Sequence, residues 1–275
     1  MTIFVRHVKI LSASLKNKKG RRDIMKERHE LAIEITKKAA AYLKQMFGQI
    51  VSGQEKSYLD LVSEADKAAE SIMTALIQKY FPSDKILSEE SKEKKGKSPF
   101  GWILDSLEAT HNYLAGLDPW GCSAAVEEKG VVVFGACAFP NKFFYGEKGG
   151  GAFCNSKRIH VSVTKQLRGQ MFFCDSAYRF APEMILRDIR RFCGTGCRLR
   201  STGSFQFNMT RLALGLAGVV TNRSPKPWDV AATSLIVEEA GGIITDEKGN
   251  SWQLNSANLL ATNGLVHREA LKLFQ

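Results

Sequence analysis

The amino-acid sequence predicts a layered α/β fold in which β-sheets and helices stack on one another. Two long amphipathic helical segments open the regular part of the chain, and short apolar strand segments alternate with helical segments through its second half. The 275 residues are 44% apolar and 24% charged, which is typical of a globular protein with a large core. We therefore predict one compact unit of two lobes, roughly 29–160 and 161–275.

The first lobe begins with the two helices. Their apolar residues recur at helical spacing, first at Leu31, Ile35, Ala39, Tyr42, Leu43 and Met46, and then at Ala65, Ala69, Ile72, Met73, Leu76 and Tyr80. The segment between them predicts a hairpin or a loop, and residues 86–91 predict a short strand or loop that ends in two acids. Residues 100–105 predict a buried strand that stops at Asp105, and residues 130–162 predict strands joined by glycine-containing turns.

The second lobe alternates strands and helices. Residues 171–175 predict a strand, residues 182–192 a helix with Pro182 in its first turn, and residues 203–217 another helix. A strand at 218–222 precedes a helix at 228–242, with Asp229 at its start and Gly241 or Gly242 at its end. Two further strands, at 242–246 and 258–262, and a helix at 265–274 complete the chain.

The formal net charge of +11 is concentrated at the amino terminus. Residues 1–22 contain seven Lys and Arg residues and no acid, so they supply +7 of this charge. We predict that residues 1–28 form a flexible basic arm. It can be an organelle transit peptide, a segment that contacts RNA phosphates, or an inert extension. Its apolar run is too short to span a bilayer, so we expect no membrane association, and nucleic acid binding only through this arm.

The six cysteines do not form a C-x-x-C pair, and most lie in apolar segments. This pattern favours buried reduced thiols over a disulfide framework, and it predicts a reducing compartment such as the cytoplasm, with organelle targeting by residues 1–22 as the alternative.

Acidic residues stand at four places where strands end or helices start. They are Asp66, Glu89 with Glu90, Asp105 with Glu108, and Asp229. Each acid alone is explained as a helix cap or a surface charge. Together they predict a shared pocket, because neighbouring carboxylates repel one another unless cations neutralise them. Oxygen ligands without His or Cys select hard cations, so the pattern favours Mg²⁺ and phosphoryl chemistry.

Six motifs occur in the order DLVSEAD, LSEES, WILDSLEATHNY, GGGAFCNSKRIHVS, RSTGS and PWDVAATSLIVEEAGGIITD. In this order and at these spacings they resemble the inositol monophosphatase family over residues 29–275. The resemblance implies an αβαβα five-layer sandwich of the inositol monophosphatase and fructose bisphosphatase type. It also implies a Mg²⁺-dependent phosphomonoesterase that is inhibited by Li⁺ and forms a homodimer.

The resemblance also assigns roles to residues. It implies two or three Mg²⁺ ions, with Mn²⁺ as an alternative, held by Glu89, Asp105, the backbone carbonyl of Leu107, Glu108 and Asp229. Thr110 and Glu89 would position a metal-activated water, and Asp66 would hydrogen-bond towards Thr110. Substrate contacts would come from Ala109, Thr110, Asn222, Gly203 and Ser204.

Two residues depart from the family signature D-P-x-D-G-T. Glu108 adds a methylene, which moves its oxygens by about 1.5 Å, the length of one C–C bond. Ala109 replaces a glycine where the backbone approaches the phosphate, so its methyl group crowds the phosphate or strains the backbone. Either Glu108 still reaches the metal and the enzyme is active, or the chain is a slow phosphatase or a non-catalytic RNA- or protein-binding homologue. We favour retained activity, because Glu89, Asp105, Thr110 and Asp229 are all present.

The substrate is less tightly specified. Asn222 stands where inositol-selective members carry a Glu that binds sugar hydroxyls, and the loop after it contains Arg223 and Lys226. These basic residues suit a second phosphate or a solvated loop. The residues after Thr110 resemble the inositol branch, so the predicted substrate is inositol monophosphate or a similar small sugar or polyol phosphate. The alternatives are 3′(2′),5′-bisphosphate nucleotides and fructose bisphosphate.

Overall fold

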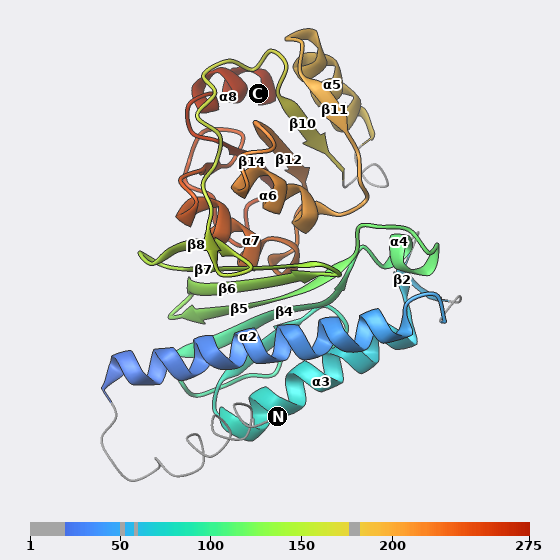
Figure 1. Cartoon of the computed structure of the whole chain (residues 1–275), viewed down its shortest axis with the longest axis vertical. Coiled ribbons are helices and arrows are strands. Elements are labelled where there is room, and N and C mark those ends of the chain that lie inside the picture. The colour runs from blue at the N-terminus through green and yellow to red at the C-terminus, as the bar shows by residue number, and fades with distance from the viewer. Residues whose placement is uncertain (1–19, 50–52, 58–59, 176–181) are drawn as a thin grey trace.

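The computed structural model describes residues 20–49, 53–57, 60–175 and 182–275, and these form stacked layers of helix and sheet (Figure 1). Helix pairs alternate with two sheets to give the αβαβα order that the resemblance implies. The predictions for residues 1–19 lie outside the described residues.

The first layer contains two long helices, α2 (Arg21–Met46) and α3 (Glu64–Tyr80), joined by a hairpin of β1 (Gln54–Ser57) and β2 (Asp60–Val62). Helix α2 starts inside the predicted basic arm, so residues 21–28 are helical and not a flexible extension. The reason is Arg28, which is buried and donates two hydrogen bonds to Asp84, at 2.8 and 2.9 Å. Its guanidinium also lies over the rings of Phe81 and Phe100.

The second layer is a seven-stranded sheet in the order β3-β4-β5-β6-β7-β8-β9. The first two strands pair in parallel and the others pair antiparallel. The strands are β3 (Lys85–Ser88), β4 (Phe100–Glu108), β5 (Gly121–Glu128), β6 (Val131–Phe139), β7 (Lys142–Glu147), β8 (Gly151–Cys154) and β9 (Lys157–Arg158). The short helix α4 (Thr110–Leu114) follows β4. One face of this sheet packs on α2 and α3 around Trp102, which is fully buried.

The third layer contains α6 (Phe205–Ala213) and α7 (Pro227–Glu239), which lie between the two sheets (Figure 1). Helix α7 approaches β6 closely at Gly135, where a Cβ atom would lie 2.5 Å from the carbonyl oxygen of Ala232. Helix α6 is shorter than predicted, because Ser204 caps its first turn and Gly215, with φ of 73°, follows its end.

A five-stranded sheet and two helices complete the fold. The strand order is β11-β10-β12-β14-β13, for β10 (Met171–Cys174), β11 (Arg198–Arg200), β12 (Val219–Arg223), β13 (Ile243–Thr245) and β14 (Asn258–Thr262). Helices α5 (Pro182–Gly194) and α8 (His267–Phe274) cover its outer face. All six cysteines are free thiols. Among the described residues, no helix has the length and apolar character needed to cross a membrane.

Candidate metal centre

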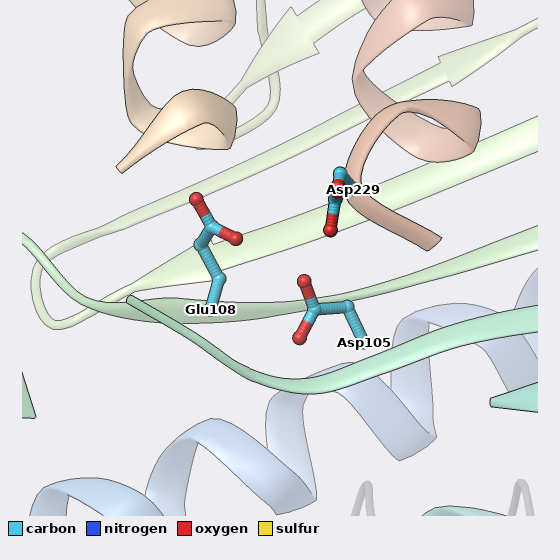
Figure 2. A group of neighbouring side chains, drawn as sticks. All are labelled: Asp105, Glu108 and Asp229. Carbon is cyan, nitrogen blue, oxygen red and sulfur yellow. The ribbon is translucent and has the colours of Figure 1, made fainter. Parts of the chain in front are cut away.

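Three carboxylates converge where the large sheet meets the middle helices. Asp105 and Glu108 come from the end of β4, and Asp229 comes from the first turn of α7 (Figure 2). One oxygen of each lies within 4.8 Å of the others. Asp105 and Glu108 are buried and Asp229 is half-buried. Residues 124 positions apart in sequence thus form one acidic cluster, which we call the carboxylate cluster.

An irregularity in β4 brings Asp105 and Glu108 to the same side. Side chains three residues apart on a regular strand point to opposite faces. Here Asp105 pairs with Ser123 and Glu108 with Gly121, so three steps on β4 match two on β5. Such a bulge adds one residue and re-aims the side chains that follow it. The bulge therefore turns both carboxylates towards α7.

Hydrogen bonds from the protein hold one oxygen of Asp229 and one oxygen of Glu108. Lys226 precedes α7 and donates its backbone N–H to Asp229 Oδ2 at 2.8 Å, which is the usual role of an acid in the first turn of a helix. The hydroxyl of Ser204 and the backbone N–H of Gln206 both lie 3.1 Å from Glu108 Oε1. The longer Glu108 side chain thus reaches the carboxylate cluster and has donors that fit its length.

The electrostatics of the carboxylate cluster favour a bound cation. Burial raises the pKa of Asp105 well above its ordinary value, and the charges of Glu108, Glu89 and Asp229 raise it further. Burial also raises the pKa of Glu108 to about 7, although the N–H of Gln206 and the hydroxyl of Ser204 oppose that shift. A cation among these groups would replace repulsion by attraction.

The donor set fits a hard divalent cation. Asp105 Oδ1 is buried and has no hydrogen-bond partner among the described residues, as expected of an oxygen that binds a metal ion. Two oxygen ligands of one Mg²⁺ lie at most about 4.2 Å apart, which is twice the Mg–O distance. The three carboxylate oxygens, which lie within 4.8 Å of one another, therefore need to move only slightly closer to bind one ion. The group contains neither His nor Cys, which disfavours zinc.

Glu89 follows β3 directly and lies next to the carboxylate cluster. The parallel pairing of β3 with β4 ends at Ser88 and Leu104, so the next residues, Glu89 and Asp105, leave the paired strands at the same level of the sheet. The Glu89 carboxylate is not among the three that lie within 4.8 Å of one another. The negative charge of Glu89 raises the pKa of both Asp105 and Glu108, which places it within electrostatic reach of the site. Glu89 is half-buried.

Thr110 and Asp66 are hydrogen-bonded, as the resemblance implies. The Thr110 hydroxyl lies 2.9 Å from Asp66 Oδ1 and 3.1 Å from the Leu107 carbonyl oxygen. Asp66 is buried in the first turn of α3, and its Oδ2 accepts the backbone N–H of Ser63 at 2.8 Å. Burial raises the pKa of Asp66, while its hydrogen bonds with Ser63 and Thr110 lower it. One carboxylate therefore caps a helix and fixes Thr110.

Ala109 takes the left-handed backbone conformation, with φ of 63° and ψ of 50°. This is the strained dihedral that the Gly-to-Ala departure predicts. Helix α4, which starts after Ala109, has only five residues, so its dipole is small.

The turn that carries Gly203 and Ser204 is fixed by Asp175, an acid outside the six motifs. Asp175 accepts the backbone N–H groups of Thr202 and Gly203, at 2.7 and 3.1 Å. Asp175 follows a strand, so the rule that identified the other acids would have found it. Ser204 caps α6 and donates to Glu108; a contact with substrate remains a prediction for Ser204 and Gly203.

Asn222 and Arg223 lie at the end of β12 and are both 2% exposed. Arg223 donates two hydrogen bonds to Asp188 of α5, at 2.7 and 2.8 Å, and lies over the ring of Phe274. It is therefore neither a solvated loop residue nor a ligand for a second phosphate. Because side chains alternate along a strand, Asn222 points to the opposite face, where α6 and α7 pack.

Comparisons with known proteins identify relatives of this chain. The family model described as "Inositol monophosphatase family" matches residues 24–275. A fructose-1,6-bisphosphatase/inositol-1-monophosphatase of Thermotoga maritima is 32% identical over 250 residues, covering 90% of this chain and 95% of its own. A putative Nus factor SuhB of Neisseria meningitidis serogroup A is 32% identical over 231 residues, covering 81% and 87%. The crystal structure of the extragenic suppressor protein suhB from Bartonella henselae superposes with a TM-score of 0.86 at 28% identity, covering 90% and 97%.

Proposed function

Because this chain belongs to the inositol monophosphatase family, whose members are metal-dependent phosphoric monoester hydrolases, we propose that it hydrolyses inositol monophosphate or a similar small sugar or polyol phosphate with Mg²⁺. The observation that carries the proposal is the convergence of Asp105, Glu108 and Asp229 on one point. When bound there, a divalent cation supplies Lewis-acid stabilisation of phosphoryl charge.

The residues around the carboxylate cluster then orient the reactants. The Thr110 hydroxyl directs its proton to Asp66 Oδ1 or to the Leu107 carbonyl oxygen, which leaves its oxygen lone pairs available as acceptors. We expect Thr110 Oγ1 to accept a hydrogen bond from the attacking water, with Glu89 as its second acceptor. Asp66 holds the Thr110 proton in place and so acts as a positioning residue.

The substrate pocket is proposed to include Ala109, Asn222, Gly203 and Ser204. Gly203 has φ of 74°, and a Cβ atom there would lie 2.8 Å from the Asn112 side chain. A glycine at this position therefore lets the turn approach α4 closely. Asn222 is 2% exposed, so its contact with sugar hydroxyls is part of the proposal. Arg223 is held by Asp188 and does not serve a second phosphate, which supports a monophosphate substrate.

Phosphate release from three substrates tests this proposal. With Mg²⁺ in excess, we expect kcat/KM to be highest for inositol 1-phosphate and lower for fructose 1,6-bisphosphate and adenosine 3′,5′-bisphosphate. We also expect Li⁺ to inhibit turnover. No phosphate release from any of the three, with Mg²⁺ or with Mn²⁺, would overturn the proposal.

The bisphosphatase alternative is favoured by the double name of the Thermotoga relative. In this chain the exposed Lys226 remains available for a second phosphate, since Arg223 is buried with Asp188. If the alternative holds, Lys226→Ala will raise KM for fructose 1,6-bisphosphate and leave KM for inositol 1-phosphate unchanged.

A second function is favoured by the relatives that carry the name Nus factor. We propose that a binding role, towards RNA or a protein partner, accompanies the enzymatic one. A salt-sensitive complex with RNA that is lost on deletion of residues 1–19 supports it. Equal RNA binding by the full and the shortened chain would contradict it. We also propose a homodimer, which sedimentation at several protein concentrations tests.

A further inference from the structure

We propose that Gln206 is a positioning residue of the metal centre, which fixes Asp105 so that its Oδ1 atom faces the cation. This rests on the proposed function and goes beyond it, because no role is assigned to Gln206 by the motifs. Gln206 lies in the first turn of α6 and is 0% exposed. Its side chain reaches across from the middle helical layer to the large sheet.

The orientation of the Gln206 amide is determined by its partners. Its Nε2 lies 2.6 Å from Asp105 Oδ2 and 3.4 Å from the Trp228 carbonyl oxygen, both of which are acceptors. Its Oε1 lies 3.4 Å from the Cys137 thiol, which is the donor. A flipped amide would set two acceptors against each other at Asp105. Only one orientation therefore satisfies the three partners.

This orientation divides the two oxygens of Asp105 between the protein and the cation. Oδ2 holds the short bond to Gln206, whereas Oδ1 is buried without a hydrogen-bond partner among the described residues. The Gln206 side chain therefore fixes the rotation of the carboxylate. Its backbone N–H meanwhile fixes Glu108 Oε1, at 3.1 Å. One residue thus holds both carboxylates of β4 from the opposite side of the site.

The Gln206 amide can act on cation binding in two opposite ways: it can orient Asp105 for the cation, or it can compete with the cation for Asp105. If Gln206 prearranges the ligand, its removal weakens cation binding, because Asp105 loses its fixed orientation. If the amide instead occupies the place of the cation, its removal strengthens binding. The two views predict changes of opposite sign in the same quantity.

The test is a calorimetric titration of the metal-free full chain with Mg²⁺, and with Mn²⁺ followed by electron paramagnetic resonance. We expect Gln206→Met, which keeps the length and removes the donor, to raise the dissociation constant about 10- to 100-fold. We also expect a broader Mn²⁺ signal, from a less uniform ligand field. Unchanged or tighter binding would overturn the proposal.

Thr210→Val is the matched control. Thr210 is a buried polar residue on the same helix. Its hydroxyl donates to the Phe207 carbonyl oxygen and accepts from Arg211, both within α6. We expect this variant to lose some stability and to keep the wild-type affinity for Mg²⁺. An equal loss of affinity in Thr210→Val would reduce Gln206 to a general packing role and overturn the proposal.

If Gln206→Met does not fold, Gln206→Asn provides the same test, because it keeps the amide but draws its nitrogen back from Asp105 Oδ2 by about 1.5 Å, the length of one C–C bond. Weaker Mg²⁺ binding supports the proposal, and unchanged binding overturns it. The titration is independent of the hydrolytic assay. Mg²⁺ binding without phosphate release contradicts only the proposed function, whereas phosphate release with unaltered affinity in Gln206→Met contradicts only the role of Gln206.

Discussion

At the scale of single residues, Glu108 is the main departure of the carboxylate cluster from the family signature. The side chain is longer than the aspartate of the family signature, yet its oxygens join the carboxylate cluster and accept hydrogen bonds from Ser204 and Gln206. These two donors are placed at the distance that a glutamate side chain reaches, so the surroundings of residue 108 fit the longer side chain.

Shortening Glu108 should therefore reduce activity, although it restores the family residue. In Glu108→Asp the carboxylate retreats by about one C–C bond, 1.5 Å, and loses both donors. A misplacement of about 1 Å costs roughly 100-fold in rate, so we expect kcat/KM for phosphate release to fall by about that factor. Equal or faster release by Glu108→Asp would show that the glutamate impairs the site.

Ala109 is strained, and its replacement by glycine should stabilise the protein. The left-handed conformation costs a non-glycine residue about 1–2 kcal/mol, whereas glycine adds about 0.4–1 kcal/mol of unfolded-state entropy. For Ala109→Gly we expect the free energy of unfolding, measured in urea, to rise by about 0.5–1 kcal/mol. A decrease would mean that the methyl group makes contacts worth more than the strain.

At the scale of elements, buried ion pairs connect segments that are far apart in sequence. Arg28 and Asp84 connect α2 to the loop before β3, and Asp84 also accepts the indole N–H of Trp102 at 3.0 Å. These contacts anchor the amino-terminal part of α2, and Arg21, its first residue, donates from Nε to Glu128 at 3.1 Å. The Lys- and Arg-rich pattern alone predicts a solvated arm, because the acidic partner lies 56 residues away.

Removing the acidic partner of Arg28 should be costly. Asp84→Ala leaves a buried guanidinium without its counter-ion, and breaking a buried pair typically costs about 3–5 kcal/mol. We expect the free energy of unfolding to fall by about this amount. The surface pair of Lys38 and Glu34 provides the control, since Glu34→Ala should change stability by less than about 0.5 kcal/mol. Similar losses in the two variants would contradict this account.

His267, at the start of α8, should make the packing of this helix pH-dependent. Its ring lies between the hydroxyls of Thr245 and Thr262, at 3.1 and 2.9 Å, and burial lowers its pKa. In the unfolded chain His267 has its ordinary pKa of about 6.5 and binds a proton more readily than in the folded chain. The stability contributed by neutral His267 is therefore complete above about pH 6.5 and is lost as the pH falls towards the lower folded-state pKa.

The comparison with His267→Gln isolates this contribution. In urea unfolding with excess chelator, we expect the stability difference between wild type and variant to be smaller at pH 5.5 than at pH 8. A difference that stays constant or grows at pH 5.5 would exclude the titration of His267 as its source.

At the scale of the whole molecule, the pattern of helices and strands predicts stacked layers, and acids at strand ends and helix starts include the three that the fold brings together. Helical and strand periodicity reflect local burial, and the motifs with Asp105 and Asp229 retain their order and spacing. The five-layer arrangement itself came from the family resemblance. Periodicity does not reveal how far apart in the fold two elements lie.

Gln206 and Arg223 could not be predicted in this way. A glutamine in the segment FQFNM looks like an interruption of an apolar helix, and its acceptor Asp105 lies 101 residues away. Arg223 resembles a surface loop residue until Asp188, 35 residues earlier, is brought beside it. Buried polar residues depend on distant partners, so only the folded arrangement shows what they do.

The central claim is that Asp105, Glu108 and Asp229 bind a divalent cation that supports phosphomonoester hydrolysis. The most direct measurement is the rate of phosphate release from inositol 1-phosphate as a function of Mg²⁺ concentration, in wild type and Asp229→Asn. We predict saturable, Mg²⁺-dependent release in the wild type and a loss of about 100-fold or more in the variant. Release that does not depend on Mg²⁺, or that is the same in the two proteins, would contradict it.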